Sequence, residues 1–254
     1  MPQDPTKRFS SRVSDYAKYR PAFPAAILEL LTTAYDFSSR TVVADIASGT
    51  GLLTRLFLDH GCRVFGIEPN LQMRLEGERQ LAGCPRFSST DGAAEATTLP
   101  SGSVDIITVA QAFHWFDRAA SAAEFRRILR PDGWVALIWN ERRKQSSAFL
   151  RAYEDLLLRF GTDYRDVDHS RIDLEAIRKF LQSPTVGART FENRQVLNYA
   201  GLEGRLLSSS YTPGVHHPQR SPMLAALKTI FDRHNDAGSV TIEYDTIVYI
   251  GAFT

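Results

Sequence analysis

The sequence predicts an α/β protein with a doubly wound, mostly parallel sheet of seven strands, in which the last strand is antiparallel. Three observations predict this fold class. Several short runs are apolar throughout, which is typical of strands that helices cover on both faces of a sheet. Helical patterns alternate with these runs along the chain. The chain has 254 residues, of which 43% are hydrophobic, so it is long enough to bury a large core.

We expect a single domain over residues 1–254, in three parts. Residues 1–39 form an N-terminal helical cap, because Ile27, Leu28 and Leu31 lie on one side of a helical pattern. Residues 40–142 form the core of alternating elements. Strands are expected at 42–45, 62–68, 86–89, 104–110 and 134–139, and helices at 52–57, 71–81 and 118–129.

Residues 143–254 change in character. A helix is expected at 149–160, and the charged stretch 161–183 is expected to be a helical insertion that covers the site. Two final strands at 190–197 and 239–250 enclose a helix at 222–234. The carboxyl ends of parallel strands form the ligand crevice of such folds. The side chains expected there are Asp45, Glu68, Gln111 and Asn140.

The clearest functional signal is the stretch 42–54, where a buried strand passes through Ala47, Gly49 and Gly51 into a helix. This strand, glycine turn and helix start allow backbone N–H groups to approach a polar ligand closely. Small residues are needed because a larger side chain in the turn would hold the ligand away. The turn therefore predicts a site for a nucleoside-containing cofactor.

The charges near the turn favour one cofactor. The dinucleotide fingerprint needs a third glycine, which is missing here, and no Gly-Lys-Ser/Thr of a Walker loop follows. Asp45 at the end of the strand would repel a pyrophosphate and attract a cation. S-adenosylmethionine carries a sulfonium and an α-ammonium, so the charge argument favours it over NAD.

Glu68 supports the same cofactor. It ends the next strand about twenty residues after the turn, where an acidic side chain accepts hydrogen bonds from a ribose diol. The alternative is a solvated charge at a strand end. Pro69 then stops the strand, and Asn70 is expected to be the N-cap of the helix at 71–81.

These motifs resemble those of the class I S-adenosylmethionine-dependent methyltransferases, which share a Rossmann-like fold. The resemblance covers most of the chain and is carried by the segments 16–21, 45–51, 66–70, 92–95, 99–100, 103–105 and 111–116. The first and last of these, with 208–211, are similar to the subgroup of trans-aconitate-type small-molecule methyltransferases. The resemblance implies methyl transfer to a small molecule, and leaves open whether the methylated atom is oxygen, nitrogen or carbon.

The resemblance also implies a set of cofactor contacts. The turn after Asp45 would hold the methionine part of the cofactor, and Glu68 would bind the ribose. Segment 93–95 would lie along the edge of the adenine. The expected S-adenosylmethionine-binding residues are Tyr16, Arg20, Asp45, Ala47, Ser48, Gly49, Thr50, Gly51, Glu68, Pro69, Asn70, Met73, Ala93, Ala94, Glu95, Gln111, Ala112 and Trp115.

Two residues depart from the family pattern. Ala47 stands where many relatives have glycine, and its methyl group tightens the approach to the methionine end. Ala93 stands where many relatives have an aspartate that accepts from the adenine amino group. Adenine recognition would then depend on backbone groups near Ala94 and on apolar contacts.

His114 and Tyr16 are the candidate catalytic residues. In-line methyl transfer depends mainly on positioning. A phenol, alcohol, amine or carbon acceptor also needs a general base, whereas a carboxylate does not. His114 follows the strand that carries Gln111, and the alternative is a structural histidine packed on Trp115. Tyr16 would close over the methyl group and Arg20 would pair with a carboxylate of cofactor or substrate; the alternative for both is an anchored cap segment.

The bulk composition limits the partners. A formal net charge of +1 argues against a dedicated nucleic-acid binder, and the run 141–144 is expected to be a solvated loop. Two cysteines without metal spacing indicate a reduced, cytoplasmic protein, and His216-His217 is expected to lie in a loop without a metal. Membrane-length apolar stretches are missing. We expect a monomer or homodimer that binds a small-molecule substrate.

The sequence therefore predicts a small-molecule methyltransferase. A second hypothesis is a non-catalytic protein that binds S-adenosylmethionine or S-adenosylhomocysteine as a regulator or interaction partner, supported by Ala47 and Ala93. A nicotinamide-dependent oxidoreductase is the third.

Overall fold

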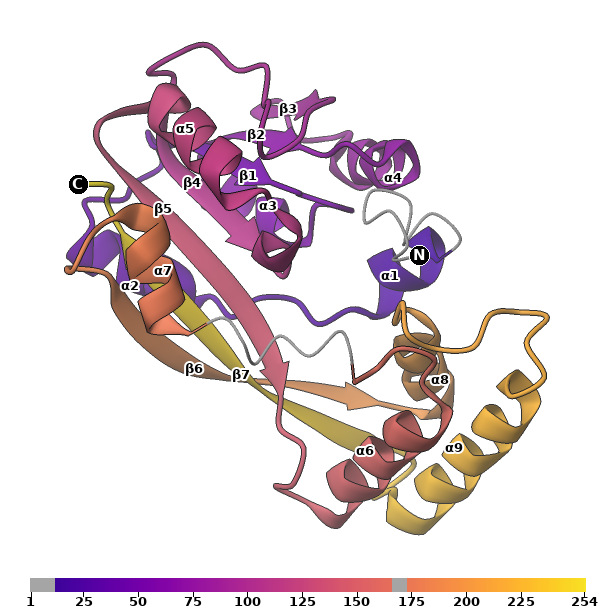
Figure 1. Ribbon diagram of the computed structural model, residues 1–254. Coiled ribbons are helices and arrows are strands. Elements are labelled where there is room, and N and C mark those ends of the chain that lie inside the picture. The colour runs from indigo at the N-terminus through magenta and orange to yellow at the C-terminus, as the bar shows by residue number, and fades with distance from the viewer. Residues whose placement is uncertain (1–11, 166–172) are drawn as a thin grey trace.

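The computed structural model describes residues 12–165 and 173–254. Its strands form a seven-stranded sheet in the order β3-β2-β1-β4-β5-β7-β6 (Figure 1). β7 is antiparallel to both of its neighbours, and the other pairs are parallel, so the predicted fold class is confirmed. The strands are β1 (Val42–Ile46), β2 (Arg63–Ile67), β3 (Phe87–Thr90), β4 (Val104–Ala110), β5 (Leu129–Arg142), β6 (Gly187–Leu197) and β7 (Val240–Gly251).

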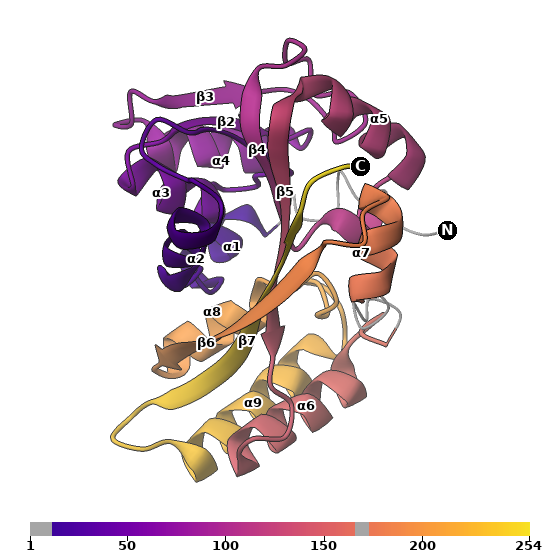
Figure 2. The ribbon, with the colours of Figure 1, turned by 90° about the vertical axis from the view of Figure 1, so that its left-hand side faces the viewer.

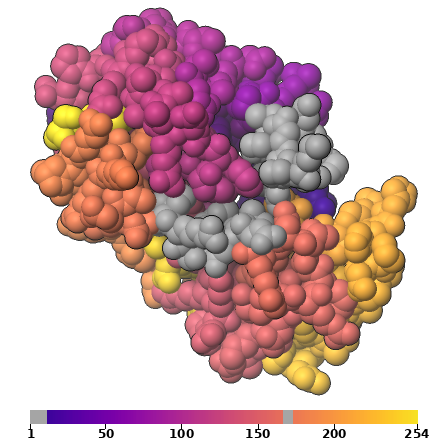
Figure 3. Space-filling view, viewed as in Figure 1, coloured from indigo at the N-terminus to yellow at the C-terminus, as the bar shows by residue number. Residues whose placement is uncertain are grey.

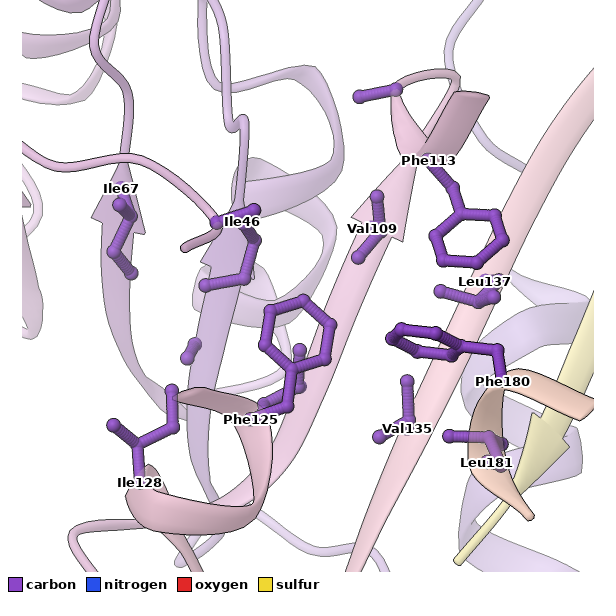
Figure 4. Close-up of a cluster of buried hydrophobic side chains, with 14 of the residues drawn as sticks. Ile46, Ile67, Val109, Phe113, Phe125, Ile128, Val135, Leu137, Phe180 and Leu181 are labelled. Carbon is purple, nitrogen blue, oxygen red and sulfur yellow. The ribbon is translucent and has the colours of Figure 1, made fainter. Parts of the chain in front are cut away.

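Helices cover both faces of the sheet. On one face α2 and α3 bury Ile27 and Phe57 against the strands, and on the other face α5 and α7 bury Phe125 and Phe180 (Figure 4). The helices are α1 (Val13–Tyr19), α2 (Ala26–Ala34), α3 (Leu52–Asp59), α4 (Leu71–Leu81), α5 (Arg118–Ile128), α6 (Ala148–Phe160), α7 (Leu174–Leu181), α8 (Tyr199–Leu207) and α9 (Arg220–His234).

The last three strands of the sheet extend beyond this core. β5 has 14 residues, whereas the apolar run predicted only 134–139. The far ends of β5, β6 and β7 carry α6, α8 and α9, and we call this assembly the C-terminal lobe (Figures 1 and 2). The lobe has its own buried cluster, which includes Phe149, Leu206, Leu227 and Tyr244. The hydrophobic interior of the protein is thus divided between the core and the lobe.

The prediction for residues 161–183 is partly wrong. Within this stretch α7 does not cover the site, but packs beside α5 on the core, where the Phe180 ring meets the edge of Phe113 at a centroid distance of 4.7 Å. The prediction relied on the many charged residues of this stretch. In the structure the charged residues of α7 occupy its more exposed side, whereas its other side is apolar and buried. Residues 166–172 lie outside the described residues.

Helix α8 is not predicted by the sequence. Gly201 and Gly204 lower its helix propensity and interrupt its pattern. The fold explains Gly204, because a Cβ there would lie 2.2 Å from the Tyr19 ring of α1. Arg12 strengthens the same contact by donating hydrogen bonds to the carbonyl oxygens of Leu207 and Ser209, at 2.8 and 2.9 Å. The N-terminal cap is therefore attached to the C-terminal lobe.

Two further predictions, for residues 216–217 and 222–234, are confirmed. His216 and His217 lie in a loop, and the helix predicted at 222–234 corresponds to α9. In the two described ranges, the structure contains no helix that is both long enough and apolar enough to cross a membrane.

Gly204→Ala is expected to destabilise the protein although alanine is the better helix former by about 1 kcal/mol. The added methyl group must displace the Tyr19 ring, and such overpacking costs about 1–3 kcal/mol. Urea denaturation measures the difference. Gly201→Ala on the same helix is the control, because its nearest contact would be 3.2 Å. Equal stability changes in the two variants would contradict the proposed packing of α1 on α8.

Candidate functional site

A cavity of about 510 Å³ opens at the carboxyl ends of β1, β2, β4 and β5 and continues to the C-terminal lobe. Residues of the core and of the C-terminal lobe line this cavity. Figure 3 shows these two parts of the molecule. The size of the cavity is typical of ligand pockets. The lining residues are Tyr16, Arg20, Pro21, Phe23, Asp45, Ala47, Ser48, Gly49, Thr50, Leu52, Leu53, Glu68, Pro69, Asn70, Met73, Ala93, Ala94, Glu95, Ala110, Gln111, Ala112, His114, Trp115, Phe116, Trp139, Asn140, Glu141, Arg142, Lys144, Glu154, Leu158, Tyr164, Arg165, Arg205, Ser210, Tyr211 and Tyr244.

The glycine turn has the conformation that its small residues predict. Ala47 has a φ of 55°, Gly49 of 58° and Gly51 of 84°, all in the left-handed region. A Cβ at Gly49 would lie 3.2 Å from the Met73 methyl group. Gly77 of α4 allows the helix to pack directly on the turn, since a Cβ there would lie 3.0 Å from the Gly49 carbonyl oxygen. Helix α4 therefore supports the turn from behind.

Gly51 is the one expected cofactor-binding residue that does not line the cavity. It is the N-cap of α3, and a Cβ there would lie 2.7 Å from the side chain of Leu81 on α4. Gly51 therefore serves the packing of α3 against α4. The sequence could not separate this role from ligand contact, because both need a small residue in a left-handed conformation.

Glu68 connects the turns that follow β1 and β2. Its Oε2 accepts from the Gly49 N–H at 2.9 Å, and its Oε1 accepts from the Asn70 N–H at 2.8 Å. The residue is 7% exposed, so the alternative of a solvated strand end is wrong. Burial raises the pKa of the Glu68 carboxyl, against the effect of these hydrogen bonds and of Arg74. Asn70 caps α4 as predicted, and accepts from the Met73 N–H at 3.0 Å.

Asp45 lies beneath the turn and is held by two hydroxyl groups. Thr54 donates to its Oδ2 at 2.6 Å, and Thr108 donates to its Oδ1 at 3.0 Å. Burial raises the pKa of the Asp45 carboxyl to about 6, although these hydrogen bonds oppose the shift. Only the fold brings Thr54 of α3 and Thr108 of β4 to this carboxylate.

The segment expected to edge the adenine lines the cavity at Ala93, Ala94 and Glu95. A short bridge between Ala93 and Ala96 shapes it. The Glu95 Oε1 accepts from the Asp117 N–H at 2.9 Å, which links this segment to the start of α5. Glu95 therefore has a structural partner in addition to its place on the cavity wall.

The remaining expected residues also meet at the cavity. Gln111 has a φ of 59° and donates from Nε2 to the Asn140 carbonyl oxygen at 3.1 Å, so it joins β4 to β5. The His114 and Trp115 rings lie 4.4 Å apart. Tyr16 enters from α1, where the Arg20 guanidinium lies 5.0 Å from its ring centre. The catalytic roles of His114 and Tyr16 stay predictions.

Sequence reasoning missed the polar wall that the C-terminal lobe supplies. The run 141–144 is not uniformly solvated, because the Arg142 side chain is only 10% exposed and pairs with Glu154. Arg205 on α8 is also buried. Tyr211 belongs to the segment 208–211 that carries part of the family resemblance, and the centre of its ring lies 4.9 Å from that of Tyr164. No local pattern marks these residues, because they come from separate elements.

Asp45→Asn is expected to become more stable relative to the unchanged protein as pH rises from about 4 to about 7. The folded pKa of Asp45 lies above its unfolded value, so the unchanged protein loses stability as pH rises from about 4 to about 6, and the loss levels off above about 6. Denaturation curves of both proteins at each pH give the difference. A pH-independent difference would contradict the raised pKa.

Ala47→Gly is expected to increase the free energy of unfolding by about 0.5–1 kcal/mol. Glycine removes the strain of an alanine in the left-handed region, which stabilises the folded state by about 1–2 kcal/mol. Glycine also gives the unfolded chain more conformations, which lowers the free energy of unfolding by about 0.4–1 kcal/mol. Ala44→Gly in buried β1 is the control and should be destabilising. Loss of stability in both variants would show that Ala47 is not strained.

Comparisons with known proteins agree with this geometry. Residues 44–137 match the family model described as a methyltransferase domain. An uncharacterized methyltransferase of Mycobacterium tuberculosis is 34% identical over 164 residues, which span 65% of this chain and 64% of that protein. An uncharacterized methyltransferase of Geobacillus kaustophilus is 30% identical over 152 residues, or 59% of this chain and 68% of that protein. The chain thus spans just under two thirds of the length of the mycobacterial relative.

Solved structures show the same fold. A type II methyltransferase assigned in Anaeromyxobacter dehalogenans has a TM-score of 0.69 at 22% identity, over 92% of this chain and 98% of that chain. A phosphoethanolamine N-methyltransferase 2 of Haemonchus contortus, solved with phosphomonomethylethanolamine and S-adenosylhomocysteine, has a TM-score of 0.58 at 14% identity, over 97% of this chain and 58% of that chain. The Geobacillus kaustophilus relative, 68% of which this chain covers, shows with the domain match that this chain belongs to the S-adenosylmethionine-dependent methyltransferase family, whose Rossmann-like class I fold it has.

Proposed function

We propose that this protein transfers a methyl group from S-adenosylmethionine to a small molecule in the cavity between the core and the C-terminal lobe. The observation that carries the proposal is the Glu68 carboxylate, which is buried at the cavity wall and anchored to the Gly49 and Asn70 N–H groups. A carboxylate held in this way keeps further lone pairs, which accept hydrogen bonds from a ribose diol.

The other residues of the core end fit the cofactor. Asp45 and Glu68 are buried carboxylates with raised pKa values, and a cationic ligand would stabilise their ionised forms. The Thr50 hydroxyl is buried at the cavity without a hydrogen-bond partner among the described residues, which leaves it available to a carboxylate. Met73 and Ala94 supply an apolar wall for a flat base.

Bound S-adenosylmethionine would supply an activated methyl group on a sulfonium for in-line displacement. This chain would contribute positioning: the glycine turn holds the donor end, and Tyr16 and the lobe enclose the acceptor end. His114 lies on the wall of the same cavity, where an imidazole nitrogen would take up the proton that an alcohol, phenol or amine acceptor loses. The small net charge supports a small-molecule acceptor rather than a nucleic acid.

Glu68→Gln is expected to weaken binding of S-adenosylhomocysteine at least tenfold. The glutamine amide removes one acceptor and places a donor opposite an N–H group or the ribose. Isothermal titration calorimetry measures the affinity, and Glu29→Gln on the exposed face of α2 is the matched control.

The activity itself is tested with labelled S-adenosylmethionine and a panel of acids, phenols and amines. Methyl transfer to a panel member supports the proposal. Tight cofactor binding without transfer to any of them would favour the non-catalytic regulator, and absent cofactor binding by the unchanged protein would overturn the proposal.

A further inference from the structure

The lobe end of the cavity gathers positive charge from three separate elements. Arg20 follows α1, Arg142 ends β5, and Arg205 belongs to α8, and all three line the cavity. Arg205 is 6% exposed, and the Arg142 side chain is 10% exposed. Buried guanidinium groups at such positions are costly unless a negative charge balances them.

In the part of the chain that the structure describes, few carboxylates balance these guanidinium groups. Glu154 pairs with Arg142 and also lies 3.9 Å from Lys144. Arg20 and Arg205 form no ion pair within residues 12–165 and 173–254. Arg20 donates to the Ser208 carbonyl oxygen at 3.0 Å, and Arg205 donates to the Tyr244 hydroxyl at 3.1 Å, so both partners are neutral.

Two guanidinium nitrogens in this part of the cavity are buried without a hydrogen-bond partner among the described residues. They are Arg142 Nη1 and Arg20 Nε. A buried N–H donor without an acceptor is costly in a folded protein, so each indicates a ligand oxygen. A guanidinium presents its donors in a planar fork that matches a carboxylate or a phosphate.

Tyr211 reports the local electrostatic potential. Burial alone would raise the pKa of its hydroxyl, but the charges of Arg205, Arg20 and Arg142 and a hydrogen bond with Ser209 outweigh burial and lower it. Burial and the like charge of Arg205 also lower the pKa of Arg20. The charge of Arg205 contributes to both shifts, in addition to the burial that lowers the pKa of Arg20 most, so the guanidinium groups act on each other and on Tyr211 at close range.

We propose that the acceptor is a small organic oxyanion, whose carboxylate or phosphate group binds to Arg142, Arg205 and Arg20 at the lobe end of the cavity. This inference rests on the proposed function and adds the chemical class of the acceptor. Tyr164 and Tyr211 form the aromatic wall beside the bound group. Neutral analogues are disfavoured, because they would leave Arg20 and Arg205 without a counter-charge among the described residues.

The test begins with cofactor binding. Calorimetry first measures the affinity of the full chain for S-adenosylhomocysteine, and failure of the proposed function shows at this step. The chain, with S-adenosylhomocysteine when it binds, is then titrated at constant ionic strength with inorganic phosphate, benzoate and succinate, and with the neutral benzamide and succinamide. Saturable binding of phosphate or of a carboxylate, without binding of the amides, is expected. The preferred anion identifies which oxyanion the cluster accepts.

Two variants locate the binding. Arg142→Gln and Arg205→Lys are each expected to weaken the preferred oxyanion at least tenfold, while affinity for S-adenosylhomocysteine changes less than twofold. Arg233→Gln on the exposed surface of α9 is the matched control and should change neither. Circular dichroism and denaturation show whether each variant folds. If Arg142→Gln does not fold, Arg142→Lys replaces it.

Several results would overturn the inference. One is the failure of every oxyanion to bind the folded, unchanged protein. Another is an equal loss in Arg233→Gln, which would indicate non-specific charge attraction. A third is a parallel loss of S-adenosylhomocysteine affinity in the variants, which would assign the cluster to the carboxylate of the cofactor.

Discussion

The site depends on one buried carboxylate, that of Glu68. It accepts from Gly49 and Asn70, and thereby holds together the turns that follow two adjacent parallel strands. Gly77 allows α4 to rest against the same turn. A single side chain can do this because the carboxyl ends of neighbouring parallel strands lie at one edge of the sheet. The group that shapes the turn is therefore also the group that the proposed ribose would meet.

The second constraint is the length of β5 and β7. Both strands continue past the core, and the helices on their far ends form a lobe with an interior of its own. Helix α1 connects the two parts, because Arg12 and Tyr19 attach it to α8 while Tyr16 lines the cavity. The core thus supplies one wall of the cavity, and the C-terminal lobe supplies the other.

The cavity is electrostatically polarised. Carboxylates of Asp45 and Glu68 lie at the core end, and the guanidinium groups of Arg142 and Arg205 lie at the lobe end. The proposed methyl donor is cationic and the proposed acceptor is anionic, so each would meet the opposite charge. Because both ends are buried, these attractions are screened much less than they would be in water.

Local sequence patterns were sufficient to predict the succession of strands and helices along the core, the glycine turn and the N-cap at Asn70. These features depend on neighbours within a few residues, which periodicity, small residues and capping side chains reveal. The sequence also identified the wall of the cavity from Asp45 to Trp115, although Gly51 proved to serve the packing of α3. The position of α7, the formation of α8 and the gathering of Arg20, Arg142 and Arg205 emerge only in the folded chain. These residues are far apart in the chain, and their meeting depends on long-range packing that no local pattern encodes.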